Sequence, residues 1–153
     1  MCDKKTSEKA LQDLLNLKNK VESSERAFMF LEEQAASSIE LLKNTHQVLP
    51  DNLQTQVLDT DSIISQLNNA KQEYFALVYE YTIKSLAVSS AICKMSLPEK
   101  YSLIPEILLD KYIKGKDDRT IMENRHISKT TYWRWLQIGY ENFEMPYIDE
   151  STL

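Results

Sequence analysis

The chain has 153 residues, of which 42% are hydrophobic and 27% charged, a balance typical of a folded protein with one domain or two small ones. Only two glycines occur, Gly115 and Gly139, so the sequence excludes a glycine-rich phosphate loop. Because tight turns between strands usually recruit glycine, this scarcity also favours helices over sheets. We therefore predict an all-α fold.

The cysteine content and hydropathy indicate a protein that stays in a reducing compartment. Cys2 and Cys93 are too few for a disulfide framework. No window approaches the roughly 18 apolar residues of a membrane span, and no apolar signal region follows the N-terminus. We expect a cytoplasmic protein that binds no membrane.

The net charge of −5 is distributed unevenly along the chain. Residues 111–140 contain seven basic and three acidic side chains, whereas the tail from Glu141 onward carries four acids and no base. Residues 1–97 are slightly acidic, with 13 acidic against 10 basic side chains. A single basic segment is thus flanked by acidic ones, and we expect an anionic partner there.

Residues 10–42 repeat apolar or small side chains at alternating steps of four and three residues. This heptad pattern places them along one seam of a helix about 50 Å long. The seam consists of Ala10, Leu14, Leu17, Val21, Ser24, Phe28, Leu31, Ala35, Ser38 and Leu42. A helix of this length cannot be enclosed by a small domain, so a second long helix is expected beside it.

The same spacing returns after a break at residues 46–61, where a turn and a helix N-cap are predicted from Pro50, Asp51, Asn52 and the Asp59/Asp61 pair. The second seam consists of Ile63, Leu67, Ala70, Tyr74, Leu77, Tyr81, Lys84, Val88, Ala91 and Met95. Two such helices predict a long antiparallel, coiled-coil-like hairpin over residues 1–97.

Further apolar side chains lie outside both seams, namely Leu15, Phe30, Leu41, Ile64, Val78, Ile83, Leu86 and Ile92. A hairpin alone would leave them in water, so we expect a homodimer through residues 10–95. A third helix that covers the same surface is the alternative.

Three short helices are predicted over residues 98–143, followed by an acidic tail at 144–153. The first begins near Pro105 and stops at Gly115; Asp117 can cap the second, 118–125, and Ser128 the third, 129–140. Short helices joined by a tight turn, with basic residues on the last, are typical of a helix-turn-helix domain. Its predicted core is Ile121, Ile127, Tyr132 and Trp135.

The turn between the last two helices departs from the usual helix-turn-helix pattern. His126 replaces the glycine that normally occupies this position, and Arg125 replaces the apolar residue before it. His126 must therefore adopt a left-handed backbone conformation, which is uncommon for residues other than glycine.

The third short helix has two different faces on a helical wheel. One side holds Tyr132, Trp135, Leu136, Gly139 and Tyr140, so Trp135 is expected in the core and Trp133 on the surface. The other side suits a DNA major groove, because Arg and Lys donate to guanine, Gln pairs with adenine and Thr methyls contact thymine. The predicted base-reading residues are Lys129, Thr130, Thr131, Trp133, Arg134 and Gln137. The predicted phosphate contacts are Lys114, Lys116, Arg119, Arg125 and Ser128.

Three short motifs of this region resemble the C-terminal end of ArpU/RinA-like phage regulators of late transcription. The motifs are Tyr112-Ile113-Lys114-Gly115-Lys116, Ile127-Ser128, and Thr131-Tyr132-Trp133-Arg134 with a small residue at Gly139. The likeness covers residues 104–143. It implies a sigma-region-four-like helix-turn-helix, double-stranded DNA as partner, activation of late or packaging genes and contact with RNA polymerase. Arg125, His126 and Met122 depart from the family pattern.

The sequence offers no candidate catalytic residues, metal ligands or cofactor motif. His46 and His126 stand in no nucleophile or metal spacing, and Asp59-Thr60-Asp61 lacks the further ligands of a calcium loop. We predict no enzyme. Two alternatives to a DNA reader remain: a coiled-coil module that binds another regulator or RNA polymerase, with Trp133 and Arg134 as anchors, and a small-terminase-like packaging subunit.

Overall fold

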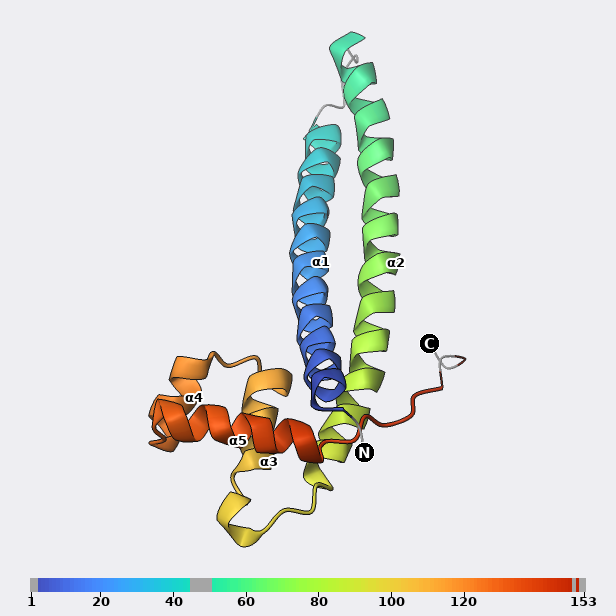
Figure 1. Cartoon of the computed structure of the whole chain (residues 1–153). Helices are drawn as coiled ribbons and strands as arrows, with labels where there is room; N and C mark the ends of the chain where they lie inside the picture. Colours follow the sequence, from blue (N-terminus) through green and yellow to red (C-terminus); the bar gives the residue numbers. More distant parts are fainter. Residues whose placement is uncertain (1–2, 45–50, 150, 152–153) are drawn as a thin grey trace. The chain divides into compact units, whose positions relative to one another are not determined.

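The structure, a computed structural model, describes residues 3–44, 51–149 and 151, with the backbone alone for 42–44 and 51–60. Its elements are α1 (Lys4–Asn44), α2 (Asp51–Cys93), the 3-10 turn η1 (Glu99–Tyr101), α3 (Ile104–Leu108), the π-helical turn η2 (Leu109–Ile113), α4 (Asp118–Arg125) and α5 (Lys129–Asn142). No strand occurs in these residues, and the prediction of an all-α fold with a long helix pair is confirmed (Figure 1).

The second long helix begins earlier than predicted. α2 starts at Asp51, so Asp59 and Asp61 lie inside this helix and the N-cap predicted for them is wrong. The physical reason is that residues 51–61 contain neither glycine nor proline, so nothing in them ends a helix. His46 and Pro50 lie outside the described residues.

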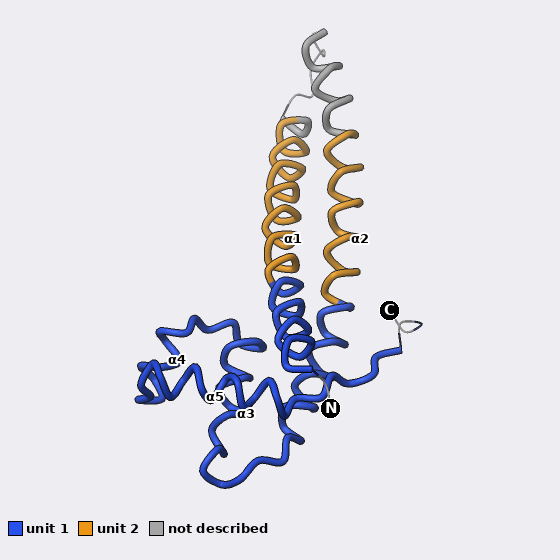
Figure 2. Tube along the Cα trace, viewed as in Figure 1, with its two compact units in different colours: residues 1–18, 79–153 blue, residues 19–78 orange. Residues whose placement is uncertain are grey.

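The chain divides into two compact units, which Figure 2 colours differently. Unit 1 contains residues 1–18 and 79–153, and unit 2 contains residues 19–78. The predicted boundary at residue 97 therefore does not coincide with the division between units. The ends of the hairpin group with the three short helices instead.

Unit 2 is a pair of antiparallel helices joined along the predicted seams. The rings of Phe28 and Tyr74 stack with centroids 5.9 Å apart, which sets the two helices in register. Every described seam residue of this unit is half-buried or buried, but only Ala35 reaches full burial. Heptad periodicity thus predicted the contact between the helices correctly.

Unit 1 has one hydrophobic core to which both long helices contribute. Leu11 and Leu14 of α1 and Val88 and Ile92 of α2 are buried together with side chains of α3, η2, α4 and α5. Ser7 Oγ donates to the buried carbonyl oxygen of Phe143, 3.1 Å away, and ties the start of α1 to the end of α5. Residues 98–143 therefore complete their core with the ends of the hairpin.

No helix in the described part of the chain carries an apolar stretch that could cross a membrane.

Candidate nucleic-acid interface

The first turns of α5 present the basic face that the sequence predicts. Lys129, Thr130 and Arg134 are exposed, and Trp133 keeps 41% of its surface accessible. Among the residues that the structure describes, neither Lys129 nor Arg134 has an ion-pair partner. Thr131 and Gln137, the two other predicted base-reading residues, are half-buried.

The opposite side of α5 holds the helix on its core. Tyr132, Leu136, Gly139 and Tyr140 are buried, as the helical wheel predicts, and the helix packs on α3. Trp135 differs from the prediction, because it is only partly buried and lies against the core rather than within it. One side of α5 is thereby immobilised while the other faces solvent.

Two ion pairs fasten α4 to η2, one at each end of α4. At its start Asp118 Oδ1 lies 2.7 Å from Lys111 Nζ, and at its end Arg125 Nη2 lies 3.0 Å from Asp110 Oδ2. Among its described side chains only Ile121 is fully buried, so apolar packing alone holds this short helix weakly. The two ion pairs therefore add to the small apolar contact in holding α4 against η2.

The ion pair at the end of α4 is part of a larger cluster of charges, with Asp110 at its centre. Its side chain is 2% exposed; Arg125 donates to Oδ2, while the ammonium groups of Lys114 and Lys116 lie 3.1 and 3.4 Å from Oδ1. Burial alone would raise the pKa of Asp110, but the hydrogen bonds from Arg125 and the two lysine ammonium groups beside Oδ1 outweigh it and lower that pKa. The carboxylate therefore stays charged inside the fold.

The aromatic ring of Trp133 is held by charges that the sequence did not indicate. Lys111 Nζ lies 5.5 Å from the centroid of this ring, and the same ammonium group pairs with Asp118. Asp118 also accepts a hydrogen bond from the Tyr132 hydroxyl, whose ring contacts Trp133 edge-on at 5.3 Å. Burial and this hydrogen bond raise the pKa of Tyr132, so its hydroxyl remains a donor.

The turn before α5 has the geometry that its unusual sequence requires. His126 adopts φ 53° and ψ 47°, the left-handed conformation predicted for it. The backbone N–H of Ile127 donates to the Met122 carbonyl oxygen at 3.0 Å and that of His126 to Glu123, which is the Schellman arrangement. Ser128 then caps α5 by accepting from the backbone N–H of Thr131, and Asp117 caps α4 in the same way, both as predicted.

Besides Ser128, which caps α5, all four basic residues among the predicted phosphate contacts form ion pairs within the protein. Arg125 donates to Asp110 and to Glu106, with Nη1 2.5 Å from Glu106 Oε2, and Lys114 and Lys116 face Asp110. Arg119 pairs with Glu123 at 2.8 Å yet leaves 86% of its side chain exposed. The phosphate role of these residues stays a prediction, and the structure gives Arg125 a second role, that of joining α4 to α3 and η2.

The sequence did not indicate that Asp110 is buried, because an acidic residue next to a lysine in a helix is typical of an exposed surface. The available signal was charge spacing: Asp110 and Lys111 are adjacent, and the opposite charges of Asp118 and Arg125 stand at the two ends of the next helix. Within residues 3–44, 51–149 and 151, no cluster of three or more His, Cys, Asp or Glu side chains could hold a metal ion.

Fold and site together define an all-α protein with a helical hairpin and a capped, basic C-terminal helix. Comparisons with protein-family models, curated proteins and solved structures gave no match. The resemblance to phage late regulators therefore stays a prediction based on short motifs.

His126→Gly will raise the free energy of unfolding by about 1 kcal/mol, because glycine adopts the left-handed conformation without the Cβ penalty. This value is the net gain, after subtraction of the cost of the greater freedom of glycine in the unfolded chain. Gly115, with φ 69°, gives the reverse test, since Gly115→Ala will destabilise the protein by a similar amount; the new Cβ would also lie 2.7 Å from Lys18 Nζ, whose flexible side chain must move aside. Urea denaturation measures both changes. A destabilised His126→Gly variant would show that the imidazole makes a contact more important than the strain.

Proposed function

We propose that this chain is a transcriptional regulator that binds double-stranded DNA and reads its sequence with α5. The observation that carries the proposal is the exposed face of α5, on which Lys129 and Arg134 have no ion-pair partner in the described part of the chain. The opposite face is buried on α3, so the helix is presented in a fixed orientation. A major groove about 12 Å wide admits one such helix.

The roles within the interface follow from side-chain chemistry. Arg134 is proposed to donate to guanine O6 and N7, and Lys129 to a base or a nearby phosphate. Thr130 offers its methyl group to thymine. Arg119 is the most exposed of the four basic residues among the predicted phosphate contacts, whereas Lys114 and Lys116 pair with Asp110 and still leave their side chains partly exposed. Their combined charge supports binding that depends on salt.

The proposed genetic target and polymerase contact come from the likeness to phage late regulators. They rest on the motifs shared with phage late regulators, which imply promoter DNA upstream of late or packaging genes and contact with RNA polymerase. A homodimer would then place two copies of α5 on half-sites separated by about one helical turn of DNA, or a multiple of it.

Arg134→Ala will reduce the affinity for a selected duplex about 10- to 100-fold and will relax base preference at one position. The duplex is obtained by selection from a random-sequence pool with the wild-type chain, and affinity is measured by fluorescence anisotropy across a salt series. Arg26→Ala, an exposed arginine of unit 2, is the control and should leave affinity unchanged. Binding that ignores salt and Arg134 together would rule out the DNA reader.

A protein partner at the same face is the second candidate, and the observation that favours it is the 41% exposure of Trp133. Tryptophan and arginine are frequent anchors of protein interfaces, and Trp133 lies next to Arg134. If no duplex is selected from the pool while Trp133→Ala abolishes binding to RNA polymerase, the protein-interaction module is correct.

A further inference from the structure

Unit 2 buries too little of its apolar surface to be complete as a pair of helices. In its described side chains only Ala35 is buried, while Met29, Phe30, Ile39, Leu41, Ile64 and Phe75 are exposed. Side chains outside a two-helix seam remain in water unless a further layer covers them. The question is which of the two sides of the hairpin is covered, and by what.

Four of these exposed residues share one side of the hairpin. Met29, Ile39, Ile64 and Phe75 each follow a seam residue directly, so each is rotated by about 100° from the seam in the same sense. Because the two helices run antiparallel and face each other, equal rotations turn all four side chains to the same side. We call the side of the hairpin formed by residues that directly follow a seam residue the apolar side.

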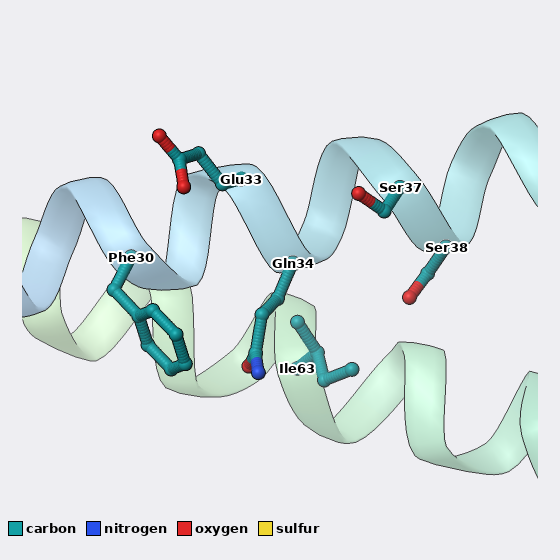
Figure 3. Close-up of a pocket in the computed structure, with 6 residues that line it drawn as sticks. All are labelled: Phe30, Glu33, Gln34, Ser37, Ser38 and Ile63. Carbon is teal, nitrogen blue, oxygen red and sulfur yellow. The ribbon is translucent and has the colours of Figure 1, made fainter.

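The other side of the hairpin is formed by residues that precede a seam position, and it is predominantly polar. Two hollows lie there, of about 530 Å³ and about 390 Å³. The first is lined in part by Lys20, Ser23 and Glu73, and the second by Phe30, Glu33, Gln34, Ser37, Ser38 and Ile63 (Figure 3). This side suits water better than an apolar partner.

The register of the hairpin makes the apolar side complementary to itself. With Phe28 level with Tyr74, Met29 lies within about 3 Å of the level of Phe75 along the hairpin, and Ile39 within about 1.5 Å of the level of Ile64. A two-fold axis along the hairpin would place each α1 residue over the α2 residue of a second copy at the same level. Met29 would then meet the partner copy's counterpart of Phe75, and Ile39 that of Ile64.

The charges on the apolar side follow the same rule. α1 contributes Glu22, Glu25 and Glu32, whereas α2 contributes Lys71, which lies within about 1.5 Å of the level of Glu32. Neither Glu32 nor Lys71 has an ion-pair partner among the described residues. If α1 of one copy packed on α1 of the other, acidic side chains would face each other and repel. If α1 packs on α2 of the other copy, acidic side chains face a basic one, which favours the contact.

We infer that a second copy of this chain covers the apolar side of unit 2, forming an antiparallel four-helix bundle in which α1 of each copy packs on α2 of the other. Such bundles are a common way for helical hairpins to complete a core. The inference specifies the predicted homodimer and does not depend on DNA binding, so either proposal can fail alone.

Two phenylalanines of nearly equal exposure distinguish the sides. Phe75→Glu, which places a charge on the apolar side, should weaken dimerisation at least about 100-fold in sedimentation equilibrium of the reduced full chain. Phe30→Glu, on the polar side, should leave it unchanged; Phe75 is 54% exposed and Phe30 59%. Circular dichroism verifies that both variants remain helical. A monomeric wild-type chain, or equal loss in both variants, would overturn the inference.

A mixing experiment tests the contact between copies directly. Glu32→Lys and Lys71→Glu should each weaken self-association about tenfold, because each homodimer then opposes like charges at two sites. An equimolar mixture of the two variants should form a heterodimer of wild-type affinity, since both sites then pair opposite charges. A pair within one chain cannot produce this recovery. If the mixture associates no better than the single variants, the proposed packing is incorrect.

Discussion

Asp110→Asn will lower the free energy of unfolding by about 3 kcal/mol. The substitution keeps the shape of the side chain but removes the charge that three cations share inside unit 1. Breaking a buried ion pair costs about 3–5 kcal/mol. The lower end applies here because Arg125, Lys114 and Lys116 are partly exposed and regain some hydration. Urea denaturation measures the change.

The matched control is a carboxylate that pairs on the surface. Glu123→Gln removes the partner of Arg119, but both side chains are largely exposed, so the loss should stay below about 1 kcal/mol. Equal effects of the two substitutions would mean that the buried cluster contributes no more than a surface pair. The stabilising role that we assign to the ion pair between Arg125 and Asp110 at the end of α4 would then be wrong.

The pH dependence of this difference follows from the pKa of Asp110. Since the pKa of Asp110 is lower in the folded protein than its ordinary value of 3.8, the carboxylate stabilises the fold fully above that value. The contribution disappears as the pH falls through the lower, folded pKa. The stability difference between wild type and Asp110→Asn should thus be constant near neutral pH and shrink below about pH 4. A difference that does not shrink in acid would contradict the lowered pKa.

Gly139→Leu will destabilise unit 1 by about 3 kcal/mol, at the upper end of the usual cost of overpacking. A Cβ atom at this position would lie 3.1 Å from Ile104 Cγ2 and 3.1 Å from Leu108 Cδ1, which leaves no room for the rest of a leucine. α5 would have to move away from α3. Because α5 carries the proposed DNA-reading face, DNA affinity should fall together with stability.

The Gly139→Ala variant distinguishes the effect of steric crowding from the effect of the backbone freedom of glycine. Alanine favours a helix over glycine by about 1 kcal/mol, and this gain offsets the small shift that one methyl group imposes on α3. Its unfolding free energy should remain within about 1 kcal/mol of wild type in the same urea experiment. A large loss for alanine would show that α3 and α5 cannot separate by even a few tenths of an ångström.

Local features of unit 1 could be predicted because they depend on neighbours within a few residues. Asp117 and Ser128 cap their helices as expected, since a cap requires only a short polar side chain three residues before the N–H that it accepts. His126 was identified in the same way, from a helix end that lacks glycine. Heptad spacing likewise predicted the seams between α1 and α2, although it could not show whether a second copy covers the remaining apolar side.

Contacts between distant residues could not be predicted by this reasoning. Arg125 and Asp110 are 15 positions apart, and on a helical wheel Arg125 looks like any basic surface residue. The spacing of Trp135 predicted a core position, but in the structure its side chain lies against the edge of the core and is only partly buried. The division of the hairpin between two compact units depends on which ends pack with α3 and α5, and no periodicity records that.

The sequence by itself determined that the chain is helical, which seams join α1 and α2, and where α4 and α5 are capped, because spacing, caps and left-handed positions act over one or two turns. Only the tertiary structure decided which charges meet. It turned Arg125, Lys114 and Lys116 toward Asp110 and left Lys129 and Arg134 to solvent, because burial and pairing are set by elements brought together from distant parts of the chain.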